Sequence, residues 1–215
     1  MIVTTPDNVV VAHRRPIQSA LKRALDVVAS ALGLVLLSPI LLLAAIAIRT
    51  TSRGPVFFRQ ERVGRNFRPF RIYKFRTMVV DAPQRGGPLT ARADPRITPA
   101  GRVLRKTKID ELPQLINVLV GDMSLVGPRP EVPRYVEMFR SDYAYILAVR
   151  PGITDPASVK YRDEAAVLAG SEDPEAAYVS RILPDKIALA RQYIDRASLA
   201  YDLRLIALTF LRLFR

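Results

Sequence analysis

The chain has 215 residues, enough for one domain with a sizeable core, and its 33 Lys and Arg against 20 Asp and Glu give a net charge of +13. The sequence has no cysteine and one histidine, His13, which excludes disulfides, thiolate metal sites and cysteine nucleophiles and argues against His-cluster zinc sites. The charge points to a polyanionic partner: nucleic acid, nucleotide phosphates or an anionic membrane. Residues 1–76 carry most of this net charge, with 13 Lys and Arg against 3 Asp and Glu. His13, which lies in this segment, is expected to be a surface residue.

After a basic segment over residues 1–23, an uncharged run of 22 residues extends from Val27 to Ile48. As a helix the run would be about 33 Å long, close to the hydrocarbon thickness of a bilayer. Pro39 removes a backbone donor in its middle, and Ser38 can hydrogen-bond a freed carbonyl. Basic flanks on both sides favour the cytoplasmic face for both ends. We therefore expect a re-entrant membrane helix over 24–48, bent at Ser38-Pro39, and a cytosolic-face domain over 49–215; a simple span and a buried soluble helix are the alternatives.

Residues 55–78 alternate between apolar or aromatic and basic residues, with Gly64-Arg65-Asn66 as a turn, and predict a β-hairpin. Its aromatic rings could stack nucleic-acid bases or lie in a core. Residues 81–99 are rich in Pro, Gly, Ala and Arg and predict a surface loop. One helix is expected over about 100–108 and another from Asp110 to about residue 120, because Pro113 is tolerated only in the first turn of a helix.

The segment SLVGPRP is expected to be extended or a turn, fixed by its two prolines. Helices are expected at about 133–147, 162–169 and 174–197, broken by RPGITDP and by Pro184. Residues 199–215 carry Leu and Phe at helical spacing with interleaved Arg, which indicates an amphipathic helix, either on the membrane interface or packed on the core. The expected fold class is α/β, mostly α with a small β-hairpin.

Two adjacent carboxylates, Asp110 and Glu111, stand at the predicted helix start after a basic cluster that includes Arg105. A helix N-terminus stabilises carboxylates and phosphates alike. Arg129, restricted by a proline on each side, suits bidentate contact with phosphate. This set fits phosphoryl transfer assisted by a hard cation such as Mg²⁺. Plain structural roles stay open: Asp110 as an N-cap, Glu111 as a partner of the helix dipole, and Arg129 as a solvated loop residue.

The ordered strings KFRTM (74–78), DPRITPAGRVLRKTKIDELPQLINVLVGDMSLVGPRPE (94–131) and RPGIT (150–154) strongly resemble the bacterial sugar transferase family, the monotopic polyprenyl-phosphate phosphoglycosyl transferases. The chain looks like a minimal form, and the resemblance extends from about Lys22 to the C-terminus. It implies transfer of a phosphosugar from a UDP-sugar to a polyprenyl (undecaprenyl) phosphate at the cytoplasmic face of the bacterial inner membrane. UMP would be released, in the first membrane step of glycoconjugate assembly.

The resemblance also implies roles for single residues. Asp110 would attack the β-phosphate, carry a covalent phosphosugar and bind Mg²⁺, and Glu111 would share in catalysis. The family's Ser-Pro break in the re-entrant helix matches Ser38-Pro39. The basic residues expected to contact phosphate are Arg129, Arg105 and Lys74.

Two departures from the family pattern stand out. Lys108 occupies a position that is usually small and polar, and Asp155-Pro156 follows RPGIT where many members continue Gly-Leu. The second departure bears on sugar choice or membrane contact. Membrane lipids and a homodimer are further possible partners, whereas nucleic acid is not expected. The alternative functions are a membrane-tethered nucleic-acid-binding module and a catalytically silent scaffold.

Overall fold

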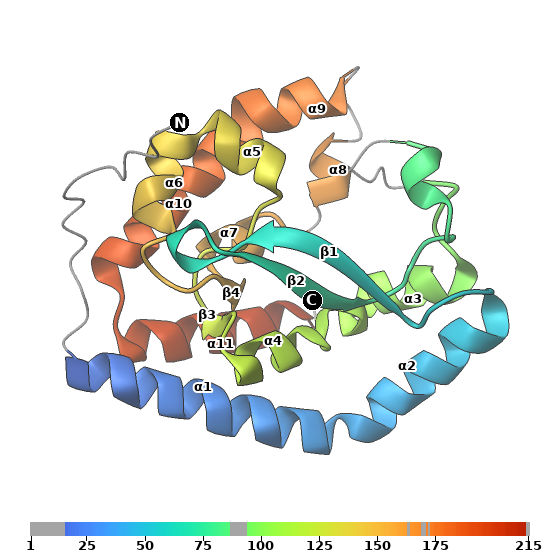
Figure 1. Cartoon of the computed structure of the whole chain (residues 1–215), viewed down its shortest axis with the longest axis horizontal. Helices are drawn as coiled ribbons and strands as arrows, with labels where there is room; N and C mark the ends of the chain where they lie inside the picture. Colours follow the sequence, from blue (N-terminus) through green and yellow to red (C-terminus); the bar gives the residue numbers. More distant parts are fainter. Residues whose placement is uncertain (1–15, 87–93, 163, 169–170, 172, 214–215) are drawn as a thin grey trace.

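The computed structural model describes residues 16–86, 94–162, 164–168, 171 and 173–213 (Figure 1). His13, the start of the basic N-terminal segment and the middle of the loop predicted over 81–99 lie outside the described residues. The described part of that loop holds a short 3-10 turn, η2 (Ala82–Gln84), and a bridge between Met78 and Ile97.

The apolar run forms two helices, α1 (Pro16–Leu36) and α2 (Ser38–Thr51), which meet at an angle of 60° along one edge of the molecule (Figure 1). The predicted break at Ser38-Pro39 is confirmed. Ser38 Oγ donates to the carbonyl of Val35 at 2.7 Å, which is the carbonyl that residue 39 would bond if it were not proline. Within the described chain, no single helix is long and apolar enough to cross a bilayer, but this bent pair meets the length and composition test together.

The predicted hairpin is confirmed as β1 (Phe57–Val63) and β2 (Pro69–Phe75), antiparallel and joined through η1 (Arg65–Phe67). The register runs from Phe57 opposite Phe75 to Val63 opposite Pro69. Phe75 is buried and stacks on the half-exposed Phe57. The hairpin therefore places one of its aromatic rings in the core.

The helix predicted over 100–108 is confirmed as α3 (Pro99–Thr107), but the helix start predicted at Asp110 is wrong. Lys108 ends α3 in a left-handed conformation, with φ 59°. A 3-10 turn, η3 (Ile109–Glu111), follows, and α4 (Gln114–Val120) begins only after Pro113. The reversal at Lys108 leaves too few residues before Pro113 for more than one tight turn. Asp110 therefore does not sit at the start of an α-helix.

Two three-residue strands, β3 (Ser124–Val126) and β4 (Gly152–Thr154), pair in parallel. β3 lies in the segment SLVGPRP, which is predicted to be extended or a turn, but β4 and the pairing of the two strands are not expected, because a run of three residues has no readable alternation. The other helices are α5 (Pro133–Met138), α6 (Arg140–Ile146), α7 (Pro156–Lys160), α8 (Glu164–Leu168), α9 (Pro174–Ala177), α10 (Leu183–Arg196) and α11 (Leu199–Leu213), with a π-helical turn, η4 (Tyr178–Ile182), before α10.

Two of the predicted helix boundaries need correction. The helix predicted over 133–147 is two helices, because Phe139 leaves the helical region (φ −120°, ψ 38°). Pro184 does not break the chain, since it lies in the first turn of α10, where a proline needs no N–H partner. The break predicted at RPGITDP is confirmed, since this segment holds β4 and leads directly into α7.

Buried polar side chains attach α1 to the domain. Asp26, 2% exposed, accepts from the backbone N–H of Leu125 at 3.1 Å and pairs with Lys22 at 3.4 Å. Lys22 also pairs with Asp202 of α11 at 3.2 Å. Arg23 donates to the last carbonyls of α4 at 2.7 and 3.0 Å. The bent helix pair is therefore held to the domain by charged groups near the start of α1.

α11 packs on the domain along one face only. Asp202 and Leu205 are buried against the domain, whereas Leu203, Phe210 and Leu211 are each more than half exposed. One face of the helix thus packs on the core and the other presents apolar side chains outward.

Candidate active site

Asp110 and Glu111 lie together in η3, which contacts both α3 and β2. β2 brings Lys74 to Glu111, and the loop after β3 brings Arg129 to the same carboxylate. Three segments far apart in the sequence therefore meet at this pair.

Glu111 is held between two cations. Lys74 Nζ lies 2.8 Å from Glu111 Oε1, while Arg129 donates from Nη1 to Oε2 at 3.1 Å and from Nη2 to Oε1. Burial alone would raise the pKa of Glu111, but Arg129 and Lys74 hold that pKa well below its usual range. Glu111 in turn raises the pKa of Arg129. Glu111 is thus a fixed anion, and both of its oxygens are engaged.

Asp110 has the opposite environment. It is 8% exposed, and its Oδ1 is buried without a hydrogen-bond partner in the described chain. Burial and then the charge of Glu111 raise the pKa of Asp110, against the pull of Lys74, Arg105 and Lys108. A buried acceptor without a partner needs an explanation, because leaving one unsatisfied costs about 1–3 kcal/mol. An oxygen completed by a ligand or a cation is such an explanation.

The donor set at this pair fits a magnesium ion that is shared with a substrate. No group of three or more His, Asp or Glu among the described residues could hold a metal by itself. Mg²⁺ is commonly bound by one or two carboxylates together with substrate phosphates and water. Asp110 has an oxygen to offer, whereas Glu111 is already paired.

Backbone contacts fix the loop that carries Arg129. Gly152 donates to the carbonyl of Pro128 at 2.9 Å, and the N–H of Arg129 donates to Asp155 Oδ2 at 3.2 Å. Gly127 and Gly152 lie backbone to backbone, since a Cβ on Gly152 would lie 2.1 Å from the nitrogen of Gly127, and a Cβ on Gly127 would lie 3.1 Å from the nitrogen of Gly152 and 2.5 Å from the carbonyl oxygen of Arg150. The guanidinium therefore projects from a rigid support.

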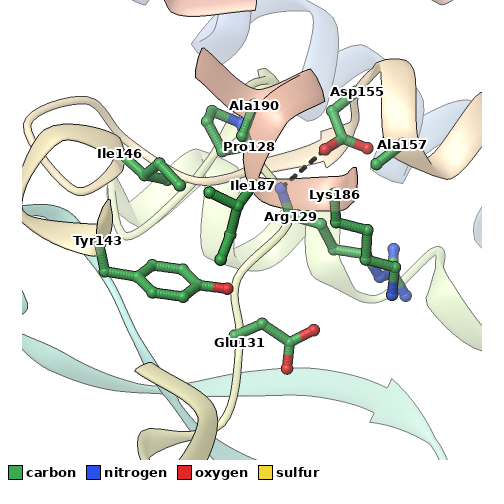
Figure 2. A pocket seen from close by; sticks show the side chains of 10 residues that line it. All are labelled: Pro128, Arg129, Glu131, Tyr143, Ile146, Asp155, Ala157, Lys186, Ile187 and Ala190. Atoms are coloured by element: carbon green, nitrogen blue, oxygen red, sulfur yellow. Dashed lines mark hydrogen bonds between the residues drawn. The ribbon is translucent and has the colours of Figure 1, made fainter. Parts of the chain in front are cut away.

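A cavity of about 20 Å³ lies behind this loop, and Figure 2 shows Tyr143 and Glu131 on one side of it and Asp155 and Lys186 on the other. That volume has room for a molecule the size of water. Glu131 accepts from the hydroxyl of Tyr178 at 2.6 Å and pairs with Arg62 at 3.5 Å. The cavity is too small for a sugar ring and belongs to the support of the Arg129 loop.

The structure brings four of the expected site residues together: Lys74, Asp110, Glu111 and Arg129. Arg105, in the last turn of α3, acts on Asp110 through its charge. Ser38 and Pro39 lie at the bend between α1 and α2.

Sequence reasoning missed two buried polar residues that support this arrangement. Asn117 accepts from the N–H of Tyr73 at 2.8 Å and donates to the carbonyl of Arg71 at 3.0 Å, so it holds β2 against α4. Asp155 caps α7 by accepting from Ser158 N at 2.6 Å. The Asp-Pro-x-Ser spacing could have revealed that cap, whereas nothing in the sequence marks Asn117.

A family model described as bacterial sugar transferase matches residues 17–215. A UDP-glucose:undecaprenyl-phosphate glucose-1-phosphate transferase of Caulobacter vibrioides is 43% identical over 194 residues, which cover 87% of this chain and 67% of that protein. An exopolysaccharide production protein of Rhizobium leguminosarum is 39% identical over 193 residues, 86% of this chain and 91% of that protein.

A UDP-N-acetylgalactosamine-undecaprenyl-phosphate N-acetylgalactosaminephosphotransferase of Aeromonas hydrophila is 47% identical over 147 residues, 67% of this chain but 35% of that protein. The chain thus spans about a third of this relative's length. These relatives' names differ in the sugar that they specify, so similarity alone does not select a donor.

Proposed function

We propose that this chain, which belongs to the bacterial sugar transferase family, transfers a phosphosugar from a UDP-sugar to undecaprenyl phosphate or a similar polyprenyl phosphate and releases UMP. The observation that carries the proposal is the contrast within one pair: Asp110 has a buried oxygen without a partner, beside a Glu111 that two cations fix. The names of the similar transferases supply the substrate class.

The geometry suits Asp110 as the nucleophile. In the first step a carboxylate oxygen of Asp110 would form a bond to the β-phosphorus, while the bond from that phosphorus to the bridging oxygen breaks and UMP leaves with it. In the second step an oxygen of the lipid phosphate would attack the same phosphorus, and the carboxylate of Asp110 would leave. UMP would leave before the lipid phosphate reacts with the phosphosugar on Asp110, so the kinetics should be ping-pong.

The neighbouring cations have distinct tasks in this scheme. Arg129 and Lys74 keep Glu111 anionic and in place, and the faces of their charged groups that do not touch Glu111 can attract phosphate oxygens. Arg105 adds positive charge on the side of Asp110. Mg²⁺, held by Asp110 and the diphosphate, would supply charge neutralisation for the leaving UMP.

The bent helix pair would place this site at the membrane surface. α1 and α2 would enter and leave the bilayer on the cytoplasmic side, with the bend at Ser38-Pro39 inside the lipid. An acceptor phosphate at headgroup depth could then reach Asp110 without its isoprenoid leaving the bilayer.

The test is UMP release by the protein in nanodiscs with Mg²⁺, undecaprenyl phosphate and a panel of UDP-sugars. Asp110→Asn should lower the rate by at least about 1,000-fold, because the amide oxygen is a poor nucleophile. Asp81→Asn is the matched control, since Asp81 pairs with Arg85 on the exposed surface and should change the rate less than about twofold.

Chelation by EDTA should abolish release as well, and an intact-protein mass increase equal to the phosphosugar should appear when the lipid is omitted. Lipid-dependent release that persists in Asp110→Asn would exclude the covalent scheme. Absence of release and of any mass adduct with every UDP-sugar would argue against the activity.

A further inference from the structure

We propose that Asp155 is a positioning residue for Arg129. Its carboxylate ties the backbone of the Arg129 loop to the first turn of α7 and so sets where the guanidinium stands against Glu111. The expected effect on turnover rests on the proposed function, but the expected effect on the structure does not.

The first argument is the hydrogen-bond ladder between β3 and β4. Gly127 donates to the carbonyl of Thr154, the last residue of β4, at 3.1 Å, so the contact with β4 continues one residue past the end of β3. In the segment that continues from β3, the next backbone donor after Gly127 is the N–H of Arg129, because Pro128 has none. The opposite chain has already turned into α7 at Pro156, so no strand carbonyl remains there. The side chain of Asp155 supplies the missing acceptor, 3.2 Å from Arg129 N.

The second argument is that one carboxylate performs two tasks. Asp155 Oδ1 accepts from Ser158 N at 2.6 Å and caps α7, while Oδ2 takes the bond from Arg129. Asp155 is 1% exposed, so its carboxylate cannot turn to water instead of these two amides. Figure 2 shows its carboxylate turned toward the backbone nitrogen of Arg129. The start of α7 and the Arg129 loop are thereby held at a fixed distance from each other.

The third argument is charge. Glu111 is the main cause of the raised pKa of Arg129, and the charge of the Asp155 carboxylate, which bonds the backbone of the same residue, raises it further. A neutral residue with a single acceptor could cap α7, as serine does in many helices, but it could not bond both amides. The sequence departure at this position thus has a structural consequence for the catalytic pair.

The test separates the two tasks with the substitution Asp155→Ser. Serine keeps an acceptor for the cap of α7, but its shorter side chain cannot also accept from the N–H of Arg129. Asp173→Ser is the matched control: Asp173 caps α9 by accepting from Glu175 N and Ala176 N, both at 3.0 Å. Asp155→Asn, which preserves volume, replaces the serine variant if that variant does not fold.

Hydrogen exchange is the first measurement, and it does not depend on activity. A peptide over residues 127–131 reports on few amides, because Pro128 and Pro130 carry no N–H. We expect the Arg129 amide to exchange at least about tenfold faster in Asp155→Ser and to be unchanged in Asp173→Ser. Equal exchange of this amide in the wild type and Asp155→Ser would overturn the proposal.

Turnover is the second measurement, read as a double-mutant cycle. Asp155→Ser should lower kcat about tenfold with Arg129 present, and less than about twofold in an Arg129→Ala background, because a positioning residue acts only through its partner. A loss of the same size in both backgrounds would show a general structural role and overturn the proposal. A wild type that releases no UMP contradicts the proposed function alone, and the exchange result still decides this inference.

Discussion

At the scale of single residues, Asp110 and Glu111 are adjacent carboxylates with opposite environments. Glu111 is held by Lys74 and Arg129, while Asp110 is buried with a free oxygen. Their pKa values are accordingly moved apart, that of Glu111 downward and that of Asp110 upward. Such a division lets one carboxylate stay anionic while the other remains available to form a bond.

We predict that Glu111 stabilises the fold at neutral pH through this ion pairing. Because its pKa is lowered on folding, its contribution is complete above the unfolded value of about 4.3 and is lost as the pH falls through the lower folded pKa. Glu111→Gln should therefore have a lower Tm than the wild type by a constant amount between pH 5 and 7. The gap should narrow below about pH 4, in thermal scans at matched ionic strength. A gap that widens on acidification would contradict this assignment.

Residue types and their order singled out this pair of carboxylates, but they did not predict its geometry. The spacing of Asp110 and Pro113 favoured a helix start at Asp110, yet Lys108 in a left-handed conformation turned the segment into a 3-10 turn. A positive φ at a lysine has no sequence signal, since asparagine and glycine are the residues that favour it. The partners of Glu111 lie 37 and 18 residues away, and only tertiary packing joins them.

At the scale of elements, several arginines act as helix caps. Arg76 is 5% exposed and donates to the carbonyls of Ser52 and Arg53 just past α2, and Arg23 donates to the last carbonyls of α4. Arg150 donates to the carbonyl of Gly121 at the end of α4, at 3.0 Å. Part of the chain's positive charge is therefore committed to carbonyl groups, and the net charge overstates what an anionic partner meets.

We predict that Arg76→Lys lowers Tm by about 5 °C, because a lysine cannot bridge the carbonyls of Ser52 and Arg53 with a planar fork, and one of the two carbonyls would lose its donor. Arg49→Lys, at the exposed end of α2, is the control with the same chemical change and should move Tm by less than about 1 °C. Similar shifts for the two variants in thermal scans would argue against the cap.

The bend between α1 and α2 makes a second prediction at this scale. Because the chain has no cysteine, Gln18→Cys and Thr51→Cys each give one thiol at the exposed outer ends of the pair. In spheroplasts neither should react with an impermeant maleimide added outside. With Pro39→Ala, residue 39 regains an N–H for the carbonyl of Val35, the pair should straighten, and one thiol should become reactive. External labelling of either thiol with Pro39 intact would exclude the re-entrant arrangement.

Elements with a clear pattern were predictable. The break at Ser38-Pro39, the hairpin and α3 follow from proline chemistry, alternation and helical spacing. β3 and β4 were not, because parallel pairing of Ser124–Val126 with Gly152–Thr154 depends on contacts across the intervening helices rather than on either segment. The sequence did not predict that the helical chain continues through Pro184, because no residue pattern marks the π-helical turn that precedes this proline.

At the scale of the whole molecule, the exposed apolar side chains gather on three helices, α1, α2 and α11, two of which are joined by an ion pair. The helices α1 and α2 expose many large apolar side chains, and α11, joined to α1 through Lys22 and Asp202, exposes more at its C-terminal end. If α1 and α2 enter a bilayer, this ion pair keeps the beginning of α11 at the level of the basic start of α1. The exposed apolar residues of these three helices are Leu21, Val28, Leu32, Val35, Leu36, Ile40, Leu42, Leu43, Ile46, Leu203, Leu208, Phe210 and Leu211.

We predict that the outer face of α11 contacts lipid. The chain has no tryptophan, so Phe210→Trp introduces a single reporter, and its emission in nanodiscs should be quenched by brominated lipid at least about threefold. Val167→Trp is the control, because Val167 is equally exposed, 58% against 59%, but lies on α8. Equal quenching at both positions, or none at residue 210, would place α11 away from the bilayer.

The contact between Gly127 and Gly152 has a consequence for how such proteins are compared. A side chain on either residue would meet backbone atoms of the other strand, so no substitution at one can be compensated by a substitution at the other. Methods that find contacts from correlated exchanges need pairs that vary together. We expect this pair to be silent to them, although it fixes the loop that carries Arg129. In an alignment of related sequences this contact would leave two constant columns and no sign that the two residues touch.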